Sequence, residues 1–190
     1  MVEQLLRDQY MTPSFQFIAL PSEQFTPLFS QSDEQLKAMG ARRMVVDENP
    51  GFPCRVSLAD AEIGETVILA RFTHHDVLSP YRASGPIFVR SGARTASPGA
   101  GDIPAMFRHR LLSIRAYDDS AMMVDAEVVK GGDLENDIQR LFANDRVSYL
   151  HIHNARPGCY NCRVVRARQT AGANRTLVTC ISDAFSASAA

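Results

Sequence analysis

The sequence predicts a single α+β domain, with a mainly antiparallel sheet and a few flanking helices. Short runs rich in β-branched and aromatic residues recur along most of the chain, which is typical of strands. Only a few segments space their apolar residues as an amphipathic helix does. Strands and helices do not alternate regularly, and this disfavours a parallel sheet built from strand–helix–strand units.

The strand signals follow one another from the first third of the chain to the last. The segments 110–118 and 121–129 are joined by only two residues, which predicts a hairpin. The other expected strands cover residues 14–20, 42–47, 66–72, 86–90, 146–153 and 162–168.

Helices are expected in two places. The segment 21–41 predicts two short helices, with Ser32 and Gln35 as a capping box. The segment 132–144 has apolar residues at helical spacing behind Asp133, which we expect to be the N-cap. We expect an extension over residues 1–13, the domain over 14–168 and a C-terminal tail over 169–190.

Composition excludes some classes of function. Hydrophobic residues make up 45% of the 190 residues and charged residues 22%, which is ordinary for a globular protein. The net charge of -1 argues against a nucleic-acid partner, because such binding needs clustered positive charge. No stretch reaches the ~20 apolar residues that span a bilayer, and no secretory signal is evident. We therefore expect a cytoplasmic protein that does not contact a membrane and whose cysteines are reduced.

The segment "YLHIHNARPGCYNC" (149–162) concentrates residues that bind metals. Alternate residues of a strand share a face, so His151 and His153 project side by side. Cys159 and Cys162 form a C-x-x-C pair after the turn. Two imidazoles and two thiolates suit tetrahedral zinc, although the spacing matches no established zinc motif. The same residues also suit ordinary packing, because cysteine is among the residues most often buried.

A second group of polar residues lies between two expected strands, in the loop "THHDVLSPYRASG". His74, His75 and Tyr81 are candidates for binding a small ligand there, since loops on a sheet commonly carry binding residues. If this loop lies near His151 and His153, one pocket would hold up to four imidazoles. Solvated or hydrogen-bonded structural roles are the alternative for each histidine.

A metal-free mechanism is a further alternative. Cys159 would be the nucleophile, a histidine its base, and Asn154 the group that orients the histidine. The signatures of nucleotide-binding loops, zinc proteases and serine hydrolases do not occur in the sequence.

Several motifs in order resemble one bacterial family, the domain of unknown function DUF1203. They are "PCRVSLADAEIGE", "HHDVLSPYRASGPIFVR", "RLLSIRAYD", "MMVDAEVV" and "HIHNARPGC". The resemblance covers Phe15 to Ala167 and implies a single domain, without a known activity, substrate or cofactor. Cys162 departs from the pattern, which weakens a zinc site that needs both cysteines. The matching residues are Cys54, His74, His75, Tyr81, His151, His153, Asn154 and Cys159.

The leading hypothesis is therefore a zinc-binding or small-ligand-binding domain. His151, His153 and Cys159 are the expected metal ligands, with His74, His75 and Tyr81 as partners in binding a small molecule. The alternatives are the metal-free enzyme with Cys159 as nucleophile, and an interaction domain without site chemistry. The sequence leaves open whether the chain is an enzyme, which ligand it binds and its oligomeric state.

Overall fold

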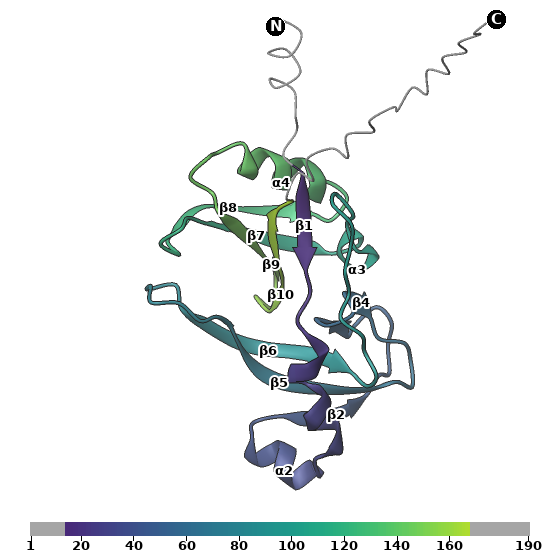
Figure 1. Cartoon of the computed structure of the whole chain (residues 1–190). Helices are drawn as coiled ribbons and strands as arrows, with labels where there is room; N and C mark the ends of the chain where they lie inside the picture. The colour runs from purple at the N-terminus through teal and green to yellow at the C-terminus, as the bar shows by residue number, and fades with distance from the viewer. Residues whose placement is uncertain (1–13, 168–190) are drawn as a thin grey trace, which may run out of the picture.

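The computed structural model, which describes residues 14–167, is built around two five-stranded sheets (Figure 1). The C-terminal sheet has the order β1-β10-β9-β7-β8, and the N-terminal sheet has the order β2-β5-β6-β3-β4. All pairs are antiparallel except β3 with β6. The C-terminal sheet contains β1 (Phe15–Ile18), β7 (Leu111–Tyr117), β8 (Met123–Lys130), β9 (Tyr149–Asn154) and β10 (Tyr160–Arg166). The N-terminal sheet contains β2 (Arg42–Val45), β3 (Pro53–Cys54), β4 (Ala59–Asp60), β5 (Thr66–His75) and β6 (Ala83–Arg90).

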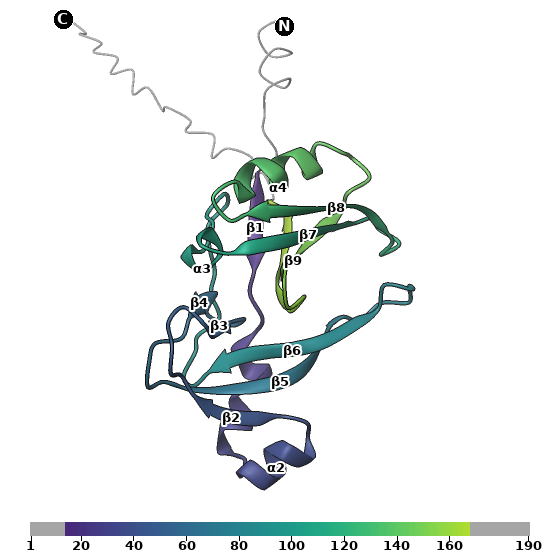
Figure 2. The same cartoon turned by 180° about the vertical axis from the view of Figure 1, so that it is seen from behind.

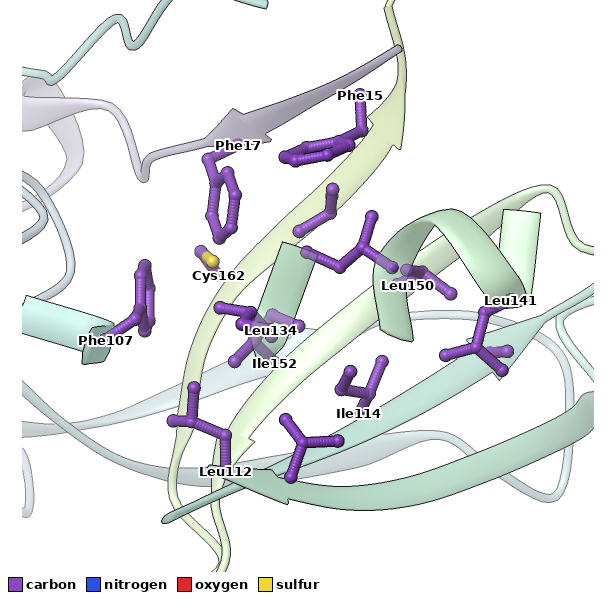
Figure 3. Packing of buried hydrophobic residues seen from close by; sticks show 14 of the residues in the cluster. Phe15, Phe17, Phe107, Leu112, Ile114, Leu134, Leu141, Leu150, Ile152 and Cys162 are labelled. Atoms are coloured by element: carbon purple, nitrogen blue, oxygen red, sulfur yellow. The ribbon is translucent and has the colours of Figure 1, made fainter. Parts of the chain in front are cut away.

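The main apolar core lies on one face of the C-terminal sheet, beneath helix α4 (Leu134–Phe142). The helix buries its apolar stripe against the strands, as its spacing predicts, and the views from both sides show it above β7 and β8 (Figures 1 and 2). Leu112, Ile114, Leu150 and Ile152 meet it from β7 and β9 (Figure 3). The short helix α3 (Ala105–Arg108) adds Phe107, which stacks on Phe17 of β1.

The N-terminal sheet is built on the long β5–β6 hairpin, and smaller apolar clusters pack on its faces. The 3-10 helices η1 (Ser22–Gln24) and η2 (Thr26–Ser30) and the helix α2 (Asp33–Ala38) pack against it. The predicted capping box is present, since Ser32 and Gln35 bond reciprocally at the start of α2.

The coarse prediction of an α+β domain with mainly antiparallel pairing and few helices is confirmed, but the strands divide between two sheets. The expected strand 66–72 is longer than predicted. β5 continues to His75, so His74 and His75 lie on a strand and not in a loop. The predicted extension over 1–13 and tail over 169–190 lie outside the described residues. Within residues 14–167, no helix is long and apolar enough to cross a membrane.

Candidate functional site

Three histidines from two different sheets converge at one point. His74 comes from β5, and His151 and His153 come from β9. One ring nitrogen of each lies within 4.8 Å of the other two. The ring of His74 has its centroid 6.0 Å from that of His151 and 5.2 Å from that of His153. The site therefore exists only where the two sheets face each other.

Strand alternation explains the two histidines of β9. This strand is the middle one of its sheet, and its first five residues are all buried, so both of its faces are covered. Leu150 and Ile152 point into the apolar core, and His151 and His153 point the opposite way. Both histidines are buried, with exposed fractions of 2% and 0%.

A β-bulge explains the contribution of β5. The pairing of β5 with β6 shifts register between Thr73 and His75, which leaves His74 unpaired in the ladder. Adjacent residues of a regular strand face opposite ways, but here both histidines reach the same neighbour. The ring of His75 lies 4.8 Å from that of His151, and the ring of His74 lies 6.0 Å from it.

Hydrogen bonds assign the protons of two of the rings. A carbonyl oxygen only accepts, so His153 Nδ1–H donates to Gly158 O at 2.9 Å, and Nε2 keeps a free lone pair. His75 Nδ1–H donates to Tyr81 O at 2.8 Å, and its Nε2 accepts from the Tyr149 hydroxyl at 2.8 Å. Both nitrogens of His75 are thus satisfied, which gives this histidine a supporting role beside the cluster.

The three clustered histidines differ from His75 because each has a buried ring nitrogen without a partner. Within the described part of the chain, these atoms are His74 Nδ1, His151 Nδ1 and His153 Nε2. A buried polar atom without a hydrogen bond costs about 1–3 kcal/mol. Three such atoms in one place indicate a site that a ligand completes.

Burial keeps all three rings neutral. It lowers the pKa of His74 to about 4, of His151 to about 2 and of His153 to about 3, from an ordinary value of 6.5. Neighbouring histidines lower these pKa values further, because each disfavours a positive charge on the others. At neutral pH each ring therefore offers a lone pair.

Tyr160 packs against the three-histidine cluster, and its backbone carbonyl is bound by a buried arginine. Its ring stacks on His74 at 4.7 Å and is inclined by 5°. Arg55 is 1% exposed; its Nε donates to Tyr160 O at 2.8 Å and its Nη1 donates to Pro53 O. Although burial lowers the pKa of Arg55 to about 10, the guanidinium keeps its charge at neutral pH. No sequence pattern marked Arg55 as a link between β3 and β10.

The cysteines lie apart from the histidines. Cys159 is half-buried in the β9–β10 turn, where its Sγ contacts Pro157 O at 3.9 Å, and it is not part of the three-histidine group. Cys162 is fully buried on the apolar face of β10, and burial raises the pKa of its thiol. The C-x-x-C pair therefore does not present two thiols to one ion.

The remaining predicted residues have local partners. Asn154 accepts a hydrogen bond from Asn161 Nδ2 at 2.9 Å through its own Oδ1. Tyr81 contributes its backbone carbonyl to His75, and its side chain is exposed. His75 thus links the predicted loop residues to the cluster.

One family model, described as "Protein of unknown function (DUF1203)", matches residues 51–166. The chain belongs to the DUF1203 family. The match covers more than half of the chain and confirms the resemblance, over a narrower range than the motifs indicated. All three clustered histidines lie inside the DUF1203 range, whereas β1, α2 and β2 precede it. No curated protein and no solved structure matches the chain.

Proposed function

We propose that this member of DUF1203 binds a divalent transition metal, zinc in the first place, through His74, His151 and His153. The observation that supports it is the convergence of three neutral imidazoles, two buried and one half-buried, each with a buried ring nitrogen that has no partner among the described residues. This ligand set keeps two residues of the sequence-based hypothesis and replaces Cys159 with His74.

The donor set suits zinc. Imidazole nitrogen is a common zinc ligand, at about 2.0–2.1 Å, and it also suits copper, iron and nickel. Tetrahedral bonds of that length hold ligand nitrogens about 3.3 Å apart. The nitrogens lie up to 4.8 Å apart, so rotation of the imidazoles would close the site around the ion. The bond from His153 Nδ1 to Gly158 O already orients one ring, as outer partners of metal-bound histidines do.

Three protein ligands imply a catalytic rather than a structural role. Structural zinc sites are closed by four protein ligands, whereas catalytic sites leave one position for water or substrate. A metal ion held by His74, His151 and His153 would supply Lewis-acid chemistry at that position. Among the described residues, no carboxylate belongs to the three-histidine group.

Elemental analysis of untagged protein, purified without chelators, tests the metal and its ligands. We expect near-stoichiometric zinc in the natural protein and in Cys159→Ser, and loss of zinc in His74→Gln and in His151→Ala/His153→Ala. His109→Gln is the matched control, because His109 is half-exposed and pairs with Asp60 outside the cluster. A metal-free natural protein from zinc-replete cells contradicts the proposal, and zinc loss in Cys159→Ser transfers the site to the thiolate.

A metal-free thiol mechanism is the second candidate. The observation in its favour is Arg55, a buried cation whose charge interacts with Cys159. Arg55 has no ion pair with a carboxylate in the described structure, and a nearby positive charge favours the thiolate form of a cysteine. A nucleophilic Cys159 would react rapidly with iodoacetamide near neutral pH, whereas Cys54 and Cys162 are buried and should react only after unfolding. A slow, ordinary rate at Cys159 contradicts this candidate.

A further inference from the structure

The sheet face that carries the histidines also carries two arginines. Arg115 of β7 and Arg163 of β10 are both paired in register with His151 of β9. Residues directly opposite each other on neighbouring strands share a face. The three side chains therefore form one row across the sheet, with the histidine in the middle.

The spacing of this row fits a small ion. Neighbouring strands lie about 4.8 Å apart, so the two arginine backbones are about 10 Å apart with His151 between them. Arginine side chains are long enough to reach toward each other over that span. Arg115 and Arg163 both neighbour His151 in the ladder. In agreement with this placement, the charge of Arg115 lowers the pKa of His74 and His153, and the charge of Arg163 lowers the pKa of His151.

Neither cation is neutralised by a carboxylate in the described part of the chain. The described ion pairs involve other basic residues: Arg43, Arg82, Arg90, His109, Arg110 and Arg140. The Arg163 guanidinium lies over the Tyr149 ring, 4.0 Å from its centroid, which positions the group without cancelling its charge. Arg115 is half-buried. Both guanidinium groups therefore lack an ion-pair partner among the described residues and can bind an anion.

We infer that Arg115 and Arg163 hold an oxyanion, a carboxylate or a phosphate, of the substrate that reaches the metal. The inference rests on the proposed metal site, because it names the class of molecule that this site would take. Guanidinium groups match carboxylate and phosphate oxygens through paired hydrogen bonds. The row places that anion next to His151, so the group bonded to the anion lies within reach of the open metal position.

A second basic region supplies the competing explanation for anion binding. A cleft of about 470 Å³ is lined by His109, Arg110 and Arg156, among others. Arg110 is already engaged by Asp60, whereas no ion pair is described for Arg156. An anion held in this cleft would depend on Arg156, and none of the three clustered histidines lines the cleft.

Inorganic phosphate is the probe that separates these two sites. Its binding is measured by calorimetry, at constant ionic strength, on chelator-treated protein. The ³¹P relaxation rate of phosphate is then measured on protein loaded with paramagnetic Co²⁺, because only a phosphate close to the ion relaxes faster. We expect Arg115→Gln and Arg163→Gln each to weaken phosphate binding at least about tenfold and to abolish the faster relaxation. Arg156→Gln should change neither.

Each outcome decides a separate statement. Phosphate binding that is lost in Arg156→Gln and kept in the other two variants overturns the inference. Binding that depends on Arg115 and Arg163 in a protein that takes up no metal supports the anion site and refutes the metal site. Metal uptake with phosphate binding unchanged in all three variants refutes the anion site alone. Where binding follows Arg115 and Arg163, displacement of phosphate by sodium acetate assigns the site to carboxylates as well, and no displacement assigns it to phosphates.

Discussion

The two faces of β9 are equally buried and chemically opposite. Leu150 and Ile152 are 0% exposed on one face, and His151 and His153 are 2% and 0% exposed on the other. The apolar pair finds all its partners in the core beneath α4. The histidine pair leaves two ring nitrogens without partners among the described residues. Burial alone therefore does not separate a core from a site, whereas the satisfaction of polar atoms does.

The largest effect should come from the apolar face. Ile152→Ala removes a fully buried side chain from the main cluster and should lower the free energy of unfolding by about 4 kcal/mol. Because its side chain points away from the histidines, zinc content should not change. Urea unfolding measures the first effect, and elemental analysis of the folded fraction measures the second. Zinc loss from folded Ile152→Ala protein would show that the two faces are not independent.

The histidine face should respond to pH where the apolar face cannot. His151 and His153 have pKa values of about 2 and 3 when folded, and ordinary values near 6.5 when unfolded. Below pH 6.5 the unfolded chain binds protons that the folded protein does not, so stability falls as the pH falls toward the folded pKa values. Metal-free protein should therefore lose about 3 kcal/mol through this pair between pH 8 and pH 5.5.

The matched comparison for this pH effect is the variant His151→Gln/His153→Gln. Urea unfolding of both proteins at several pH values between 5 and 8 gives the slope of the free energy of unfolding with pH. The difference between the two slopes isolates the two histidines, because every other titrating group is common to both proteins. The variant should be less sensitive to acid. Equal slopes would mean that these histidines take up protons at the same pH in the folded protein as in the unfolded chain.

Local patterns predicted each face of β9 but not what lies across from it. Alternation placed His151 and His153 side by side, and helical spacing identified the apolar stripe of α4. The third histidine depends on how two sheets pack and on a bulge at His74, neither of which leaves a signal in a short window. Cys159 lies nearer in sequence to His153 and was therefore the expected ligand. In the structure Cys159 lies in the β9–β10 turn and does not belong to the three-histidine group.

Strand register explains the other residues that the sequence analysis missed. Arg115 and Arg163 flank His151 only because β7, β9 and β10 pair in one particular register. A shift of one residue would move every side chain to the opposite face. Arg55 could not be identified from the sequence for a different reason: arginine is rarely fully buried, so its residue type predicts an exposed side chain.

A smaller effect tests whether the β9–β10 turn serves the histidine face specifically. Gly158 has φ +74°, and its carbonyl oxygen accepts a hydrogen bond from His153 Nδ1–H. In Gly158→Ala the added Cβ would meet no neighbouring atom, but the positive φ would strain the backbone. The free energy of unfolding should therefore fall by about 1 kcal/mol. Movement of the carbonyl should also weaken zinc binding at least about tenfold.

Gly64 provides the control for this variant. It has φ +88° and open space around its Cβ position, and it lies in the turn that precedes β5, without a described bond to the cluster. Gly64→Ala should therefore show a similar loss of stability with unchanged zinc affinity. Equal zinc affinity in both variants would remove the proposed role of the Gly158 carbonyl.

The smallest effect concerns what holds α4 over the apolar face. Asp133 occupies its N-cap position but makes no side-chain capping bond, whereas Ser32 forms a full capping box on α2. Asp133→Ala should therefore cost less than about 0.5 kcal/mol and Ser32→Ala about 1 kcal/mol, both measured by urea unfolding. This difference follows from the way each helix is stabilised. The four buried side chains of α4 fix it by packing, whereas α2 buries only Leu36 and depends more on its cap. A larger loss in Asp133→Ala would mean that polar contacts, and not apolar packing alone, define this face of the sheet.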